Sequence, residues 1–280
     1  MGLFSNNFNR PGPGVPKDAP KKKGLKRFFE ILGRDLGDLF KLNLIFVACC
    51  VPMFAAGYFT VISFFLDEKL IFLGPILLGF ALFLLASILL GPALCGVHSV
   101  ITNMLRDEPI YMWTTFKKSF KSNFRTAAPL GVVFAGLVGL EAFAIVFYFK
   151  GLIASGKQMN VFLMAVFFFN VLLLTLVSLY MFLQLVYLDL KVMPIIKNSL
   201  LLTFAMAKRT LPAGIWVMVC LALIILFFPV TIVLCILFMP ILILLVADMW
   251  LWPTMEQMFH ISDLLIERRE KELAENTQSE

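Results

Sequence analysis

The chain has 280 residues, of which 60% are apolar and 15% are charged, and its formal net charge is +6. Soluble domains average about 45–50% apolar and about 25% charged residues, so this composition excludes an ordinary soluble domain and is typical of a membrane protein. The positive charge does not indicate a nucleic-acid binder, because the basic residues flank apolar segments and follow no nucleic-acid motif.

Residues 1–40 predict a polar, Pro- and Lys-rich N-terminal arm with a short amphipathic helix, too long and polar to be a cleavable signal. Six apolar windows follow, each long enough to cross a bilayer core about 30 Å thick. We therefore predict an all-α fold, a polytopic transmembrane helical bundle in residues 41–253, followed by a charged tail in residues 254–280. The predicted spans are Leu42–Phe65, Ile71–Met104, Ala127–Phe149, Val161–Leu188, Leu211–Phe228 and Thr231–Met249.

The division between the last two spans is the least distinct. Residues 211–249 are interrupted only by Pro229 and Pro240, so they could form one long kinked helix. This stretch is about twice as long as one span requires, which favours two spans joined by a tight hairpin near Pro229–Thr231.

The distribution of basic residues predicts the orientation. With the N-terminus in the cytoplasm, 21 of the 24 Lys and Arg residues lie on the cytoplasmic side, leaving Lys69, Lys150 and Lys157 outside. An even number of spans keeps both termini cytoplasmic. A possible repeat of 84 residues relates Lys41, Arg125 and Arg209, each of which lies between a semi-polar stretch and an apolar span. Sequence duplication and a recurring arrangement of interfacial helix followed by span explain this spacing equally well.

The stretch Tyr111–Arg125 predicts an amphipathic helix in the cytoplasmic interface. Aromatic residues at helical spacing would face the acyl chains, and basic residues would face anionic headgroups. Anchoring the bundle is the preferred role, with a specific lipid or partner site as the alternative. The side chains are Trp113, Phe116, Lys117, Lys118, Phe120, Lys121, Phe124 and Arg125.

Three intramembrane polar residues, Glu141, Asn170 and Gln184, are the candidate binding residues. Burying an ionisable group in a membrane is costly, so Glu141 is a functional candidate by default. Structural pairing of Glu141 is preferred over proton or cation handling and over a lipid-facing position. The other two side chains lie nearly on one helical face and are expected to bond to a neighbouring helix.

The remaining polar residues suggest structural roles. His98 follows Cys95 by three residues, but no third metal ligand is evident, so we predict a packed or hydrogen-bonded histidine and no metal site. Asp189 and Asp248 are expected to form weak, solvated ion pairs with nearby lysines. Asp107-Glu108 belongs to the polar turn before the interfacial helix and is expected to have a cap-like role. The five cysteines are expected to pack in helices, and no catalytic or cofactor motif is present, which predicts no cofactor and no enzyme activity.

One region resembles a known family. The residues that carry the resemblance are Gly91-Pro92-Ala93, Val100, Leu105-Arg106-Asp107-Glu108, Tyr111-Met112-Trp113, Phe116, Ser119-Phe120-Lys121 and Asn123-Phe124. This pattern is similar to the signature of the YesL-like family, small bacterial membrane proteins with a domain of unknown function. The similarity is specific over Gly91–Ala128, and Asn43-Leu44, Pro52 and Gly57 match the opening of the family's first span. The family pattern passes more directly from the first-span proline to Gly-Pro-Ala than this chain does.

The resemblance implies no defined activity, and it associates the chain with carbohydrate uptake in bacteria. We expect a non-enzymatic accessory or scaffold protein of the bacterial plasma membrane, which acts through helix–helix contacts and basic interfacial helices. Its expected partners are the anionic lipid bilayer and either transporter subunits or a second copy, with no nucleic acid. The alternative is a small secondary carrier with a polar site near Glu141 and Asn170 among proline-broken helices.

Overall fold

The computed structural model describes residues 22–66, 73–156, 158–188, 190–228 and 230–278. Within these ranges the regular structure is helical, and six segments are long and apolar enough to cross a membrane. This confirms the predicted all-α transmembrane bundle. The elements are α1 (Leu25–Leu66), α2 (Leu73–Ala86), the short 3₁₀ helix η2 (Ser87–Leu89), α3 (Leu90–Arg106), α4 (Met112–Ser155), α5 (Gln158–Tyr187), α6 (Val192–Ala205), α7 (Ala207–Leu226), α8 (Val230–Leu237), α9 (Met239–Phe259) and α10 (Ile261–Gln278).

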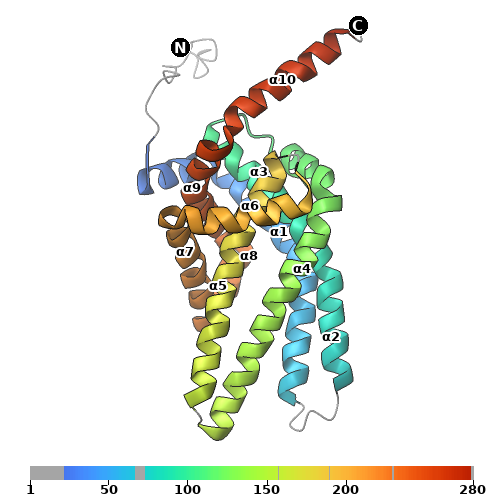
Figure 1. Cartoon of the computed structure of the whole chain (residues 1–280), viewed down its shortest axis with the longest axis vertical. Coiled ribbons are helices and arrows are strands. Elements are labelled where there is room, and N and C mark those ends of the chain that lie inside the picture. The colour runs from blue at the N-terminus through green and yellow to red at the C-terminus, as the bar shows by residue number, and fades with distance from the viewer. Residues whose placement is uncertain (1–21, 67–72, 157, 189, 229, 279–280) are drawn as a thin grey trace, which may run out of the picture.

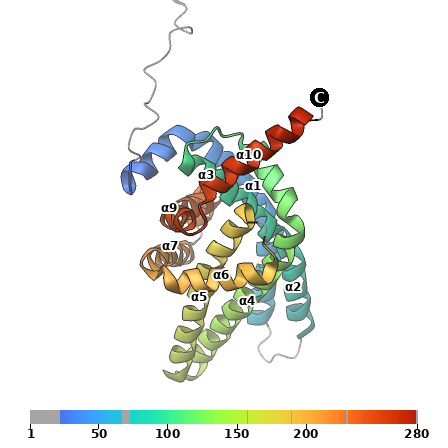
Figure 2. The same ribbon diagram turned by 45° about the horizontal axis from the view of Figure 1, so that its top comes forward.

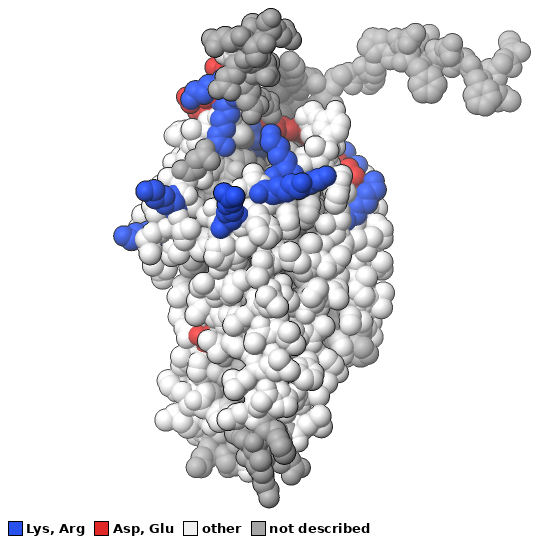
Figure 3. All heavy atoms as spheres, turned by 90° about the vertical axis from the view of Figure 1, so that its right-hand side faces the viewer, with Lys and Arg blue, Asp and Glu red and all other residues white. Residues whose placement is uncertain are grey.

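Two long hairpins, α1–α2 and α4–α5, extend from one end of the molecule, and α6 lies across the bundle at that end (Figure 1). Helix α10 begins at the same end and projects away from the body in both ribbon views (Figures 1 and 2). Lys and Arg side chains gather at this end on the face in Figure 3, above a long zone with almost no charge. We call it the basic end.

Helices α3 and α9 form the centre of the bundle. The first core cluster joins α5, α7 and α9, the second joins α1, α3 and α9, and the third joins α3, α4 and α5. Most residues of α3 are buried, including Cys95, Val97 and His98. Polar residues on these two helices therefore face other helices, while the far ends of the hairpins expose apolar side chains.

The predicted cytoplasmic approaches are continuous with the first and third spans. Lys41 lies within α1, which has a non-helical residue at Asp35, and Arg125 lies within α4. Before the fifth span the chain does break, at Met206 between α6 and α7, so Arg209 lies in the first turn of α7. The 84-residue repeat stays a prediction, since Lys41 and Arg125 lie inside long helices whereas Arg209 lies near the start of its helix.

The predicted sixth span, Thr231–Met249, is divided into two helices. Helix α8 ends at Leu237, and α9 starts at Met239 and continues to Phe259. Pro240 lacks the N–H that would bond to the Ile236 carbonyl and its ring crowds that carbonyl, so the helix breaks there. The predicted hairpin before it is present as a turn in which the Thr231 hydroxyl donates to the Ile224 carbonyl at 2.7 Å; Pro229 itself lies outside the described residues.

Helices α3 and α4 cross at two glycines. A Cβ placed on Gly91 would lie 1.9 Å from the Ala127 carbonyl oxygen, and one on Gly131 would lie 2.5 Å from the Gly91 nitrogen. Both contacts are with backbone atoms, which cannot rotate away. Small residues that permit such close backbone approach are a common basis of helix packing in membranes.

We expect Gly91→Ala to destabilise the bundle by about 1–3 kcal/mol, because the added methyl group forces α3 and α4 apart. Thermal unfolding in detergent, followed by circular dichroism, measures this as a lower Tm. Gly33→Ala is the matched control, because a Cβ at Gly33 would meet nothing within 4 Å. A Gly91→Ala variant as stable as the Gly33→Ala variant would contradict the observed crossing.

Candidate functional site

The three predicted intramembrane polar residues differ in burial and in hydrogen bonding. Gln184 on α5 is fully buried and donates from Nε2 to Ser199 Oγ on α6 at 3.0 Å. Glu141 on α4 is partly buried, and its Oε2 atom has no hydrogen-bond partner among the described residues. Asn170 is half-buried on α5. Of the three, Gln184 thus makes the predicted contact with a neighbouring helix.

The predicted interfacial helix is the first part of α4, and only part of its aromatic face is exposed. Phe116 is buried against α3, and Phe120 packs beside it in the same cluster. Trp113 is 55% exposed and Phe124 is 36% exposed. The prediction that all four aromatic residues face lipid is therefore wrong for Phe116, because α3 covers that side. The four basic residues are exposed on the other side: Lys117, Lys118, Lys121 and Arg125.

The most buried ionisable pair joins the two central helices. Nδ1 of His98 on α3 lies 2.8 Å from Oδ2 of Asp248 on α9, and the two side chains are 1% and 0% exposed. His98 is hydrogen-bonded as predicted, but the predicted solvated pairing of Asp248 with a lysine is wrong. Helix α9 continues ten residues or more beyond the apolar window, so Asp248 is in mid-helix, while Asp189 lies outside the described residues.

The His98–Asp248 pair has two further polar atoms that could form hydrogen bonds. His98 Nε2 and Asp248 Oδ1 are buried atoms without a hydrogen-bond partner among the described residues. In an apolar interior, an unpaired buried charge costs far more than a paired one, so each of the two side chains depends on the other. The arrangement holds α3 and α9 in a fixed register.

A second polar contact lies one helical turn further along α3. The hydroxyl groups of Thr102 and Tyr187 hydrogen-bond, and the Tyr187 ring packs edge-on against Trp252 of α9. The Arg268 guanidinium of α10 donates to the Tyr187 carbonyl at 3.0 Å. Tyr187 thus connects α3, α5, α9 and the C-terminal helix.

The side chain of Asn43 hydrogen-bonds to backbone groups at the break between α8 and α9. Its side-chain nitrogen donates to the carbonyls of Cys235 at 3.1 Å and Ile236 at 2.9 Å, and its Oδ1 accepts from the Ile241 N–H at 3.2 Å. Asn43 is fully buried. One amide therefore replaces helical hydrogen bonds that Pro240 prevents, which a membrane interior without water would otherwise leave unsatisfied.

The corner between α1 and α3 is held by arginines. The carboxylate of Asp107 accepts hydrogen bonds from Arg27 and Arg34 at 2.6 Å each, and both arginines also donate to the Met104 carbonyl. Cations at a helix C-terminus are favourable. Asp107 is the C-cap of α3, with φ of 62°, so its cap position belongs to the preceding helix; Tyr111 is the N-cap of α4.

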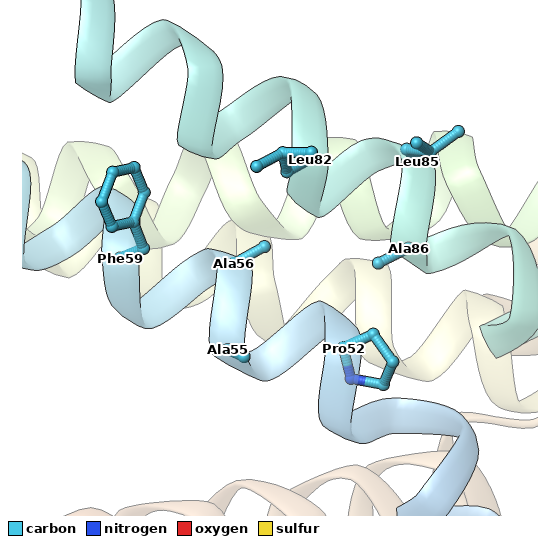
Figure 4. Close-up of a pocket in the computed structure, with 7 residues that line it drawn as sticks. All are labelled: Pro52, Ala55, Ala56, Phe59, Leu82, Leu85 and Ala86. Atoms are coloured by element: carbon cyan, nitrogen blue, oxygen red, sulfur yellow. The ribbon is translucent and has the colours of Figure 1, made fainter.

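Two of the surface pockets among the described residues are well defined, and the predicted binding residues Glu141, Asn170 and Gln184 line neither of them. A polar pocket of about 430 Å³ adjoins the arginine corner and is lined by Arg34, Asp35, Asp38, Asp107, Glu108, Pro109 and Ile110. An apolar groove of about 420 Å³ lies between α1 and α2 (Figure 4). Its lining of small and apolar residues offers no charged group: Pro52, Ala55, Ala56, Phe59, Leu82, Leu85 and Ala86.

The described residues contain no group of three or more potential metal ligands, and the five cysteines are free thiols. Cys95 points to the Phe182 carbonyl of α5, with its Sγ atom 4.0 Å from that oxygen, and not toward His98. The interior polar groups instead bind helices to one another. Together with the six helices that are long and apolar enough to cross a membrane, this arrangement defines the class of the chain as a polytopic α-helical integral membrane protein.

Residues 70–144 match the model of a family described as "Protein of unknown function, DUF624". The matched region contains α2, α3 and more than half of α4, and so includes His98 and both crossing glycines. This supports the expected similarity to a family of unknown function and leaves the YesL-like name as a prediction. Neither a curated protein nor a solved structure matches the chain.

Sequence reasoning missed two of the structural contacts that matter most. Asn43 was considered only as part of a family pattern, although a proline inside an apolar window, Pro240, signals carbonyls that need another donor. Asp248 was placed at a helix end because the apolar window stops there. Its partner His98 is 150 residues away along the chain, and no local pattern links the two.

Proposed function

We propose that this protein is a non-enzymatic accessory or scaffold protein of the bacterial plasma membrane, with both termini in the cytoplasm. The observation that supports the proposal is the use of interior polar groups as connections between helices: Asn43 to α8 and α9, Gln184 to Ser199, and His98 to Asp248. Such contacts stabilise a bundle and leave few polar groups free to bind a solute.

The alternative, a small carrier, requires a polar cavity reached by Glu141 and Asn170. The two pockets described above do not include either residue. Broken helices in transporters commonly leave backbone groups available to the substrate or ion. Here two carbonyls at the break between α8 and α9 already accept hydrogen bonds from Asn43, so they are less available to a solute. This favours the accessory role over the carrier.

Co-purification tests the accessory role. The full chain is purified from native membranes in mild detergent, and the bound proteins are identified and quantified by mass spectrometry. A stoichiometric membrane partner is expected, and a sugar-transporter subunit would extend the proposal to carbohydrate uptake. Isolation as a single chain in several detergents, together with solute uptake by the protein alone in liposomes, would overturn the accessory role in favour of the carrier.

The variant Glu141→Gln further distinguishes the accessory role from the carrier role. Because Glu141 Oε2 has no partner among the described residues, replacing the carboxyl group by an amide is expected to change the stability by less than about 1 kcal/mol. For an accessory protein, the amount of captured partner should also stay the same. Tm and partner stoichiometry, measured on both proteins, check this; a loss of liposome uptake in the variant would instead identify Glu141 as a carrier residue.

A further inference from the structure

Two groups of basic residues at the basic end differ in their ion pairs. In the first, Arg27, Arg34 and Arg106 each contact a carboxylate, at 2.6 Å or 2.8 Å. In the second, six exposed side chains of α4 and of the N-terminal part of α6 form no ion pair with any residue that the structure describes. We call these six the basic belt: Lys117, Lys118, Lys121, Arg125, Lys191 and Lys197.

The two parts of the basic belt come together at one corner of the bundle. Ile195 of α6 belongs to the same core cluster as Ala127 and Leu130 of α4. Arg125 precedes Ala127 by two residues, and Lys191 precedes Ile195 by four, so both lie close to this shared cluster. Figure 3 shows the Lys and Arg side chains gathered at a similar level along the molecule.

Helix α6 has two apolar faces. Ile195 and Leu202 are buried against the bundle, while Leu201 and Phe204 are 67% and 63% exposed on the other side. Met193 and Leu200 extend the exposed face, with Lys197 among them. Because α6 lies across the bundle (Figures 1 and 2), this apolar strip is parallel to the plane of a surrounding membrane. A helix with this composition and position lies in a membrane interface.

We propose that the basic belt binds the headgroups of anionic phospholipids, with the exposed face of α6 immersed among their acyl chains. The unpaired positive charges provide the electrostatic complementarity, since anionic leaflets attract Lys and Arg close to their surface. Trp113 and Phe124, exposed on the same segment of α4, supply the aromatic contacts that membrane interfaces favour. This binding is independent of any protein partner and of the accessory role.

Native mass spectrometry of the full chain tests the proposal. The protein, in a neutral detergent, is mixed with equal amounts of phosphatidylglycerol and phosphatidylcholine that have identical acyl chains. We expect preferential retention of phosphatidylglycerol, and a decrease of about tenfold or more in that preference for the variant Lys117→Gln/Lys121→Gln/Arg125→Gln. Raising the salt concentration should reduce the wild-type preference as well, because screening weakens exposed charges.

Three controls make the result specific. Lys22→Gln/Lys23→Gln/Lys26→Gln removes the same charge at the same end but outside the basic belt, and should retain the preference within about twofold. Lys117→Arg/Lys121→Arg keeps the charge and should behave as the wild type. Soluble glycerol 3-phosphate should not displace the lipid. Equal retention of both lipids by the wild type, no effect of the Gln variant, or displacement by glycerol phosphate would each overturn the proposal.

Discussion

Asn43→Leu is expected to destabilise the bundle by about 3–5 kcal/mol, because several backbone groups lose their partner at once. The carbonyls of Cys235 and Ile236 and the N–H of Ile241 all bind this amide. Each buried group left unsatisfied costs about 1–3 kcal/mol. Unfolding in detergent by increasing amounts of sodium dodecyl sulfate, followed by circular dichroism, measures the loss.

Asn170→Leu is the matched control, because it makes the same substitution at a position where we expect a smaller loss of stability. Asn170 is half-buried on α5, so its replacement should change stability by less than about 1 kcal/mol. Adding Pro240→Ala to the Asn43→Leu protein should recover part of the stability, because the new residue has an N–H that can bond to the Ile236 carbonyl. Equal stability of the Asn43→Leu and Asn170→Leu variants would show that the helix break does not depend on the amide.

His98→Leu is expected to cost about 3–5 kcal/mol, because it leaves the Asp248 carboxylate buried without its partner. The double variant His98→Leu/Asp248→Leu removes both polar groups, and it should recover most of that loss. With the wild type and the single variant Asp248→Leu, these two variants form a double-mutant cycle, whose coupling free energy is measured by the same unfolding assay.

Asp248→Asn tests whether the hydrogen bond or the charge matters more. The asparagine keeps an oxygen that can accept from His98 Nδ1, so its effect should be smaller, about 1 kcal/mol. If the double leucine variant lost as much stability as the two single leucine variants together, the two side chains would not be coupled, and the losses would come from packing around α3 and α9.

Hydrophobic periodicity and length were sufficient to predict the class of fold and most of the helices. The second span, for example, was predicted to continue helically to Met104, and α2, η2 and α3 together end at Arg106. Two of the differences have identifiable reasons. Pro240 breaks a largely apolar window, and α9 continues beyond Met249 because Leu251 and Met255 still pack with α5 and α7.

The polar contacts were harder to predict than the spans. The expected bond from Gln184 to a neighbouring helix is present, since a fully buried amide in α5 has few other ways to be satisfied. The partners of Asn43 and Asp248, in contrast, are more than 100 residues away. Which buried donor meets which acceptor depends on how the helices cross, and the hydropathy of one segment contains no such information.

The contact of Asn43 also determines when the fold can be completed. Its carbonyl partners lie 192 and 193 residues later in the chain, so the first span enters the membrane long before its partners are made. A chain that ends before α8 lacks all three hydrogen-bond partners of Asn43. The polar group of the first span therefore depends on the last third of the sequence for its hydrogen bonds.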